Sequence, residues 1–155
     1  MKPPPSAGCR RLLTSAMSTI IFDANFDSLD EIREFVGEAA RQVGFSNKEI
    51  YSIQLAADEA SSNIIEHAYA GIENGKIEID CSSLDGGIII VMRDQGKSFN
   101  PSSVPEPNVK ADLSNRKIGG LGMYLMRKLM DELSYESSAE TGNTLTMIKH
   151  LGDDG

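Results

Sequence analysis

The sequence predicts a two-layer α/β (α+β) sandwich, in which a mixed, mostly antiparallel sheet is covered on one face by three helices. Three segments repeat apolar residues at helical spacing, and two pairs of short β-rich segments are each joined by a turn. The chain has 155 residues, 40% of them hydrophobic, which suffices for one buried core and a single domain. Helices and hairpins that alternate in this way are typical of one sheet with helices packed on it.

The first strand and the first helix follow one another directly. The segment "TIIFDA" (residues 19–24) is rich in β-branched and aromatic residues and predicts a strand. The helix predicted over residues 28–44 begins with Ser28 and Glu31 at the spacing of a capping box and ends at Gly44. Its apolar stripe consists of Leu29, Ile32, Val36, Ala39 and Val43.

A second helix is predicted over residues 46–69, where Ser46 and Glu49 form a second capping box. Its apolar positions are Ile50, Ile53, Ala57, Ala60, Ile64 and Ala68. Beside this stripe, Glu59, Asn63 and His67 follow at four-residue spacing, which places a carboxylate, an amide and an imidazole in one row. We expect this row to face the rest of the fold rather than solvent.

Two hairpins and a third helix complete the predicted fold. "KIEIDCS" and "GIIIVMRD" flank the turn "LDGG", and the continuous apolar run predicts that the second strand is buried on both faces. Cys81 in the first of these strands is expected to be a small buried residue. "LSYESS" and "NTLTMIKH" form the closing hairpin around "AETGN". The helix "GGLGMYLMRKLMDEL" has a predicted core stripe of Leu121, Leu125, Leu129 and Leu133.

The long segment over residues 96–118 has no periodic pattern. It is rich in Pro, Ser and Asn and exceeds an ordinary connection in length, which is typical of a lid, a binding loop or disorder. We assign residues 18–151 to the single domain and residues 152–155 to a tail. Residues 1–17 are expected to be a disordered leader, or an over-long start with Met17 as the initiator, because they lack the apolar segment of a signal peptide.

Composition limits the partners and the compartment. Lys and Arg number 15 against 23 Asp and Glu, and the net charge of -8 argues against nucleic acid or an anionic membrane as principal partner. The sequence also lacks the run of about 18 apolar residues that reads as a membrane span. Two cysteines make neither a disulfide framework nor a metal cluster, so we expect a soluble, cytoplasmic protein.

Two further motifs suggest a binding site. Asp94 ends a predicted buried strand, where its carboxylate can accept a hydrogen bond from an exocyclic amine, and Gly96 would let a flat ring approach the backbone; an ordinary turn uses the same residues. Gly119, Gly120 and Gly122 lie where a helix begins, and the N–H groups and dipole of a helix start favour phosphate. Glycine pairs also serve as hinges or close-packing points.

In combination, these motifs resemble those of the Bergerat-fold (GHKL) ATP-binding superfamily. "DEASSNIIEHAY", "DQGKSF", "GGLGMYLMRKLMDEL" and "GNTLTM" occur in the order of that superfamily, over residues 19–149. "DEASSNIIEHAY" and "GGLGMYLMRKLMDELSY" are similar to the anti-sigma-factor serine kinases of bacterial stress and sporulation switches. The resemblance implies the Bergerat fold, ATP and Mg²⁺ as cofactors, and a lid at about residues 96–118.

The resemblance also implies a role for each matching residue. Asn63 matches an asparagine that holds Mg²⁺ on the phosphates, and Glu59 matches a glutamate that activates or orients the attacking group. Asp94, with Gly96 alongside, matches an aspartate that bonds the adenine amine. His67 matches a position that braces the helix end. The residues that match the lid hinge and phosphate-binding box are Gly119, Gly120, Leu121 and Gly122.

Two assignments stay open in the sequence. The superfamily usually has a threonine directly after the glycine of its last box, near adenine, whereas here Gly142 is followed by Asn143 and only then by Thr144. Either side chain could take that role. The candidates for the lid cation that neutralises the γ-phosphate are Lys97, Arg116 and Lys117.

The implied partners are a small STAS-type anti-sigma factor antagonist, which receives the phosphate on a serine, and a sigma factor that is bound reversibly. A homodimer is also possible. The alternative is a binding module of the same fold, an ATP-dependent switch that sequesters a partner without transferring phosphate; the presence of Glu59 favours the enzyme. A histidine kinase would need a helical hairpin with a phosphoacceptor histidine, and the sequence contains only His67 and His150.

Overall fold

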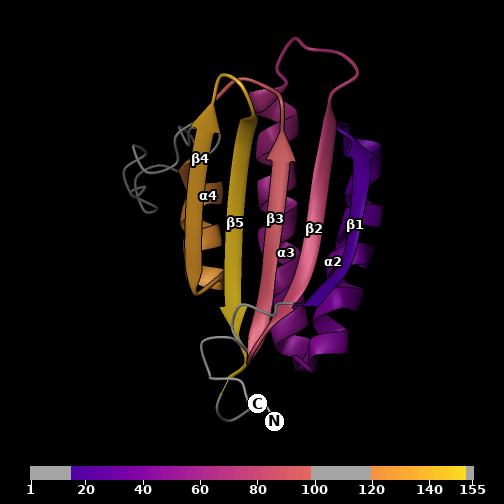
Figure 1. Ribbon diagram of the computed structural model, residues 1–155, viewed down its shortest axis with the longest axis vertical. Helices are drawn as coiled ribbons and strands as arrows, with labels where there is room; N and C mark the ends of the chain where they lie inside the picture. The colour runs from indigo at the N-terminus through magenta and orange to yellow at the C-terminus, as the bar shows by residue number, and fades with distance from the viewer. Residues whose placement is uncertain (1–14, 99–119, 153–155) are drawn as a thin grey trace, which may run out of the picture.

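The described strands form one sheet of five, and every pairing among them is antiparallel (Figure 1). The computed structural model describes residues 15–98 and 120–152. The order across the sheet is β1-β2-β3-β5-β4. The strands are β1 (Ser15–Asp23), β2 (Lys76–Leu84), β3 (Gly87–Asp94), β4 (Glu132–Ser138) and β5 (Gly142–His150). The predicted two-layer sandwich is confirmed, with the difference that the sheet expected to be mixed is antiparallel throughout these strands.

The α-helices of the described chain cover one face of this sheet, as predicted (Figure 1). They are α2 (Leu29–Val43), α3 (Asn47–Asn63) and α4 (Gly120–Leu129). A short 3₁₀-helix, η1 (Phe26–Ser28), leads into α2, and a π-helix, η2 (Ile64–Ala68), continues α3. Helix α3 packs against both α2 and α4, and its C-terminal end lies at the same end of the molecule as the end of β3 (Figure 1).

The two predicted capping boxes have different outcomes. Ser46 confirms the second one: its Oγ accepts from the Glu49 N–H at 3.2 Å, and its own N–H donates to Glu49 Oε1 at 3.0 Å. The first box is wrong, because η1 brings Ser28 into the helical conformation (φ -82°, ψ -11°) and its side chain makes no cap hydrogen bond. Strand β1 also begins earlier than predicted, at Ser15 instead of Thr19.

The core lies between the sheet and the helices, and the central strands alternate between its two sides. The fully buried side chains of β2 and β3 are Ile77, Ile79, Cys81, Ile88, Ile90 and Met92. On the opposite face of β3, Ile89 and Val91 are only half-buried, so the prediction that this strand is buried on both faces is wrong. Cys81 is buried as expected, and burial, with a smaller effect of the Asp80 charge, raises the pKa of its thiol to about 12.

The predicted core stripe of α4 is half-buried at Leu125 and Leu129, and two methionines beside it are fully buried; the side chain of Leu121 lies outside the described residues. The buried methionines are Met126 in the helix and Met130 directly after it. The helix ends at Leu129, because the Asp131 N–H donates to Ile148 O at 2.8 Å and the chain joins the sheet there. Leu133, predicted as part of the helical stripe, consequently lies in β4.

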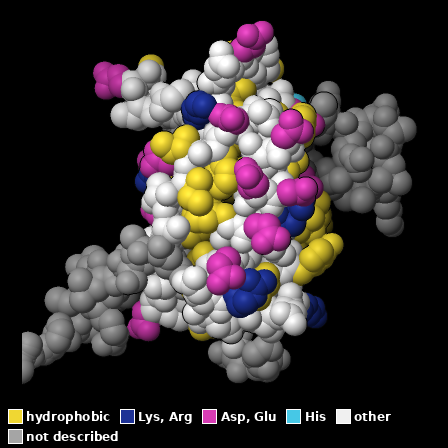
Figure 2. All heavy atoms as spheres, turned by 90° about the vertical axis from the view of Figure 1, so that its right-hand side faces the viewer, with side chains coloured by type: hydrophobic (Ala, Val, Ile, Leu, Met, Phe, Trp, Pro, Cys, Tyr) yellow, Lys and Arg dark blue, Asp and Glu magenta, His cyan; other side chains and the backbone are white. Residues whose placement is uncertain are grey.

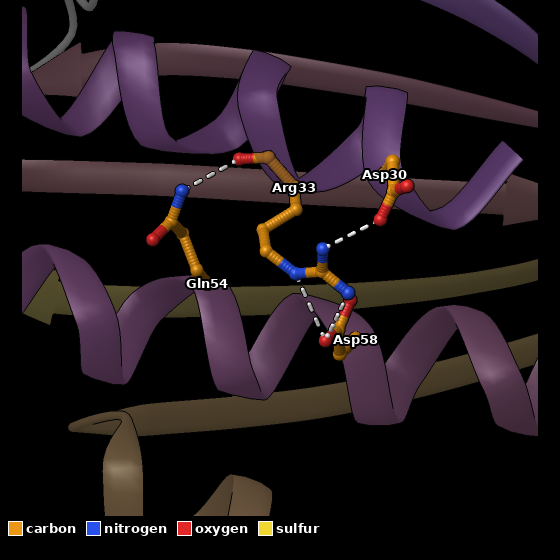
Figure 3. Close-up of polar contacts among 4 residues, drawn as sticks. All are labelled: Asp30, Arg33, Gln54 and Asp58. Atoms are coloured by element: carbon orange, nitrogen blue, oxygen red, sulfur yellow. Dashed lines mark hydrogen bonds and ion pairs between the residues drawn. The ribbon is translucent and has the colours of Figure 1, made fainter.

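A polar network joins α2 to α3 (Figure 3). Arg33 of α2 donates from Nε (3.1 Å) and Nη2 (2.8 Å) to Oδ2 of Asp58 on α3, and from Nη1 to Asp30 at 2.8 Å. The hydrogen bonds that Arg33 donates to these two carboxylates raise its pKa. Gln54 of α3 donates to the Arg33 carbonyl at 3.0 Å, directly beside Gly37, where a Cβ would lie 2.3 Å from Gln54 Nε2. A side chain at position 37 would therefore displace the Gln54 amide from this hydrogen bond.

Figure 2 shows the face formed by β1 and α2, where hydrophobic side chains are surrounded by acidic ones. A hollow of about 630 Å³ lies between these two elements. Its lining includes the apolar Ile20, Phe22 and Phe35 and the acidic Glu31, Glu34 and Glu38. These carboxylates would repel a phosphate backbone, in agreement with the charge argument. Among the described helices, none has the length and apolar character needed to cross a membrane.

Candidate functional site

Glu59 and Asn63 lie one turn apart on the same side of α3, as the sequence predicts, and both are half-buried. We call these two residues the α3 polar face. The Asn63 amide nitrogen, Nδ2, is buried and has no hydrogen-bond partner among the described residues. A buried donor left without an acceptor costs about 1–3 kcal/mol. This amide therefore needs an acceptor that the described part of the chain does not supply.

The third member of the predicted row, His67, does not continue the four-residue spacing of α3. It lies in the π-helix η2, where the Tyr69 N–H donates to Ile64 O at 3.0 Å, five residues back. This wider turn displaces His67 relative to an α-helical row. Its Nε2 lies 3.8 Å from Oε1 of Glu66. Single π-turns of this kind often occur at functional sites.

Tyr69, directly after η2, joins the end of the helix to two strands. Its hydroxyl donates to Lys76 O at 2.7 Å, at the start of β2, and accepts from the Gln95 N–H at 2.8 Å, just after β3. Its ring lies over Gly75, where a Cβ would come within 2.6 Å of the ring atoms. These contacts brace the helix end. The same role, predicted for His67, stays a prediction. The signal was present in "HAY", but the tyrosine was not singled out.

Asp94 lies at the end of β3, buried at 5% exposure, with its carboxylate held from one side. Its Oδ1 accepts from Asn143 Nδ2 and from the Gly96 N–H, both at 2.8 Å. Its Oδ2 has no hydrogen-bond partner among the described residues, which leaves it able to accept from a ligand. Burial raises the pKa of Asp94, and the two hydrogen bonds oppose that rise. We call Asp94, Gly96 and Asn143 the Asp94 corner.

Gly96 lies in close contact with the end of η2. A Cβ at this position would be 2.3 Å from Ala68 O, and that same carbonyl accepts from the Lys97 N–H at 2.7 Å. Only glycine lets the chain leave β3 this close to η2. The backbone of Ala68 thus requires the glycine, and the approach of a ligand ring to Gly96 stays a prediction.

Asn143 and Thr144 lie on opposite faces of the sheet. Asn143 is 2% exposed and lies opposite Asp94 in the pairing of β3 with β5, on the helix-covered face. Thr144 lies opposite Arg93, on the other face. Gly142 before them has φ +88°, and a Cβ there would be 2.4 Å from Asp94 O, so glycine is required. Of the two candidates, only Asn143 is part of the corner.

The other predicted residues are described to different extents. Lys97 is exposed beside the corner. Helix α4 begins at Gly120, close to where the glycines predict, and includes Leu121 and Gly122. Arg116, Lys117, Gly119 and most of the predicted lid lie outside the described residues. The helix start is thus confirmed, whereas its contact with phosphate stays a prediction.

The residues of the α3 polar face fit a magnesium site to which the protein contributes few ligands. The Asn63 carboxamide offers one hard oxygen ligand, and its unpartnered Nδ2 could donate to a phosphate oxygen. Among the described residues, no group of three or more His, Cys, Asp or Glu could hold a metal ion. A cation here would therefore take most of its ligands from phosphates and water, as Mg²⁺ usually does with nucleotides.

Comparison with known proteins decides the family. The histidine kinase-like ATPase domain matches residues 22–149. The chain belongs to this family. It is 30% identical over 126 residues to the serine-protein kinase RsbW of Bacillus subtilis. This alignment covers 77% of the chain and 76% of the relative. RsbW of Bacillus licheniformis is 34% identical over 137 residues, covering 80% of this chain and 81% of that protein. These relatives support an ATP-dependent serine kinase.

Solved structures support the same fold. The RsbU and RsbW domains of a Mycobacterium tuberculosis protein match with a TM-score of 0.61 at 20% identity, covering 87% of this chain. This chain spans 33% of that longer one. The catalytic domain of the histidine kinase ThkA matches with a TM-score of 0.51 at 18% identity, covering 86% of this chain and 96% of that domain. At these identities the likeness concerns the fold alone, which confirms the prediction of a Bergerat-type sandwich.

Proposed function

We propose that this chain is an anti-sigma factor serine kinase, which transfers the γ-phosphate of ATP to a serine of a STAS-type antagonist and reversibly binds a sigma factor in the cytoplasm. The observation that carries the proposal is the pairing of two unlike polar groups at one end of the fold. The α3 polar face has a carboxylate one turn from an unpartnered amide, and the Asp94 corner has a carboxylate oxygen free to accept. The RsbW relatives support the serine as acceptor.

Adenine would be recognised at the Asp94 corner. The free Oδ2 of Asp94 accepts a hydrogen bond from the exocyclic amine, while Oδ1 stays with Asn143 and Gly96. Guanine presents a carbonyl at that position, so the same oxygen would repel GTP. The phosphates would extend toward Asn63 and the N-terminus of α4, since the N–H groups and the dipole of a helix start favour anions.

Mg²⁺ would be held by the Asn63 side-chain oxygen together with the phosphates. When bound, the ion neutralises phosphate charge and fixes the triphosphate for in-line attack. The Asn63 amide nitrogen would donate to a phosphate oxygen, which satisfies the buried donor. Gly119 to Gly122 and a lid cation, Lys97, Arg116 or Lys117, would neutralise the remaining charge of the γ-phosphate.

Glu59 would act as the general base. Its carboxylate takes the proton from the serine hydroxyl as the serine oxygen bonds to the γ-phosphorus. The bond from that phosphorus to the β–γ bridging oxygen breaks, and ADP leaves. Because the protein positions groups and forms no covalent bond itself, small displacements of Glu59 relative to Asn63 should reduce the rate strongly.

The proposal is tested with labelled ATP and an antagonist protein encoded by a gene next to the one for this chain. We expect label on one serine of the antagonist, and none on an antagonist in which that serine is replaced by alanine. ATP-dependent partner binding without any transfer would contradict the kinase and establish the non-catalytic switch. Failure to bind ATP at all would contradict both functions.

A further inference from the structure

A line of hydrogen bonds crosses three neighbouring strands at the Asp94 corner. Ser137 of β4 lies opposite Asn143 of β5, which lies opposite Asp94 of β3. The Ser137 hydroxyl donates to Asn143 Oδ1 at 2.8 Å, and Asn143 Nδ2 donates to Asp94 Oδ1 at 2.8 Å. The amide orientation follows from these partners, since the opposite orientation would place Oδ1 against a carboxylate.

The Asn143 amide is fully engaged within the protein. Its nitrogen lies 3.1 Å from both Gly96 O and Lys97 O, in addition to Asp94. Two amide hydrogens thus serve three acceptors, so at least one hydrogen is shared. With 2% of the residue exposed, Asn143 has no donor left for a nucleotide. A direct contact of Asn143 with adenine, the role that the sequence left open between Asn143 and Thr144, does not fit this arrangement.

We propose that Asn143 is a positioning residue that makes the site selective for a purine with a 6-amino group, and that Ser137 orients it. Asn143 holds Asp94 Oδ1 inside the corner and thereby directs Oδ2 toward the ligand. The same amide fixes the two carbonyls at which the chain leaves β3, so recognition of the base and the path of residues 96–97 depend on one side chain. This inference rests on the proposed binding of adenine at Asp94.

The side chain at this position also influences the charge of Asp94. Burial disfavours the ionised carboxylate, and the Asn143 amide is the larger of the two hydrogen bonds that counteract burial. No other charged side chain contributes noticeably among the described residues. Without the amide, Asp94 would be less well oriented toward the amine, and its ionised form would lose the larger of the two hydrogen bonds that favour it, while the phosphate contacts would be unaffected.

The test compares two nucleotides that differ only in the 6-amino group: ATP and purine riboside triphosphate, each with Mg²⁺. Calorimetry gives the ratio of their dissociation constants. A hydrogen bond to a charged acceptor contributes about 1.5–3 kcal/mol, so wild type should prefer ATP by about 10- to 100-fold. In Asn143→Leu the ratio should fall to about 3-fold or less, chiefly through weaker ATP binding. A merely structural role would weaken both nucleotides alike and leave the ratio unchanged.

Ser137→Ala keeps the test decisive if Asn143→Leu does not fold. It removes only the hydroxyl that orients the amide, and the ratio should fall by about 3-fold. Thr144→Val is the matched control, because its side chain lies next in β5 on the opposite face, and its ratio should equal that of wild type. A wild-type ratio in folded Asn143→Leu or in Ser137→Ala would overturn the inference alone. A wild type that binds neither nucleotide would instead contradict the proposed function.

Discussion

The Asp94 corner and the α3 polar face lie at the same end of the fold but differ in how their polar groups are satisfied. At the corner, Asp94 Oδ1 and the whole Asn143 amide are paired within the protein. On the α3 polar face, the buried amide nitrogen of Asn63 has no partner in the described chain. The first region is thus preorganised, whereas the second contains a buried donor for which the described chain supplies no acceptor. Substitutions in the two regions should therefore affect binding, catalysis and stability differently.

Asn63→Ala should have the largest effect. It removes both the metal ligand and the donor that a phosphate would satisfy, so affinity for Mg²⁺ and ATP should fall about 100-fold and transfer should be lost. The apoprotein should not be destabilised by a lost hydrogen bond, since Nδ2 has none in the described chain. Calorimetry and a thermal melt check both parts. Asn47→Ala, an exposed asparagine at the start of the same helix, is the control and should bind normally.

Asp94→Asn should weaken ATP by about 10- to 100-fold, because a charged acceptor for the amine is lost. Its effect on stability has the opposite sign. The pKa of Asp94 is raised in the folded state, so wild type loses stability as pH rises from the ordinary aspartate range through the raised pKa. Asparagine avoids that loss, and the apo variant should melt higher than wild type at pH 7. A lower melting temperature, with Asp27→Asn unchanged, would contradict the account of burial.

Tyr69→Phe should reduce the free energy of unfolding by about 1–3 kcal/mol, since the Gln95 N–H and Lys76 O lose a shared partner. ATP affinity should fall less than in Asp94→Asn, because the carboxylate keeps its own hydrogen bonds. Denaturant unfolding and calorimetry measure the two quantities. Tyr51→Phe, at a tyrosine with 66% exposure, should change neither. Equal losses of stability in Tyr69→Phe and Tyr51→Phe would contradict the bracing role of Tyr69.

Arg33→Met should have the smallest effect, about 1 kcal/mol of unfolding free energy. The ion pair with Asp58 is half-exposed, and it lies between α2 and α3, away from the Asp94 corner. ATP affinity should stay unchanged. The control is Arg41→Met, which breaks an exposed pair with Glu38 and should leave stability within experimental error. A large loss of ATP binding in Arg33→Met would show that this network also positions the α3 polar face.

The sequence predicted the layers, the hairpins and the three α-helices because each depends on local periodicity. The Ser46 capping box succeeded for the same reason, and the Ser28 box failed because η1 altered the backbone before the helix began. The π-helix η2 has no comparable signal in the sequence. Glu59, Asn63 and His67 are four residues apart in the chain whether the helix is α or π. Leu129 and Leu133 pack against the core as predicted, but the deeper burial of Met126 and Met130 depends on packing against α3 and the sheet, which the leucine spacing does not indicate.

Within the site, sequence and structure contributed different parts. Glu59, Asn63, Asp94 and Gly96 were predicted from motifs. The structure shows the contacts of Asp94 and Gly96 and the unpartnered amide nitrogen of Asn63 among the described residues. The choice between Asn143 and Thr144 required the register of β5 against β3, because adjacent residues of a strand face opposite sides. Ser137 could not be found from the sequence, since its partner lies on the neighbouring strand and no motif includes it.

Glu59→Gln tests most directly that the α3 polar face performs phosphoryl transfer. The substitution keeps the shape of the side chain one turn before Asn63 and removes the carboxylate that takes the proton. The affinity for ATP should stay within about 3-fold of wild type, while transfer to the antagonist serine should slow by about 10²–10⁴-fold. Glu73→Gln, at an exposed glutamate in the loop after η2, serves as the control. A wild-type rate of transfer in Glu59→Gln would contradict Glu59 as the general base.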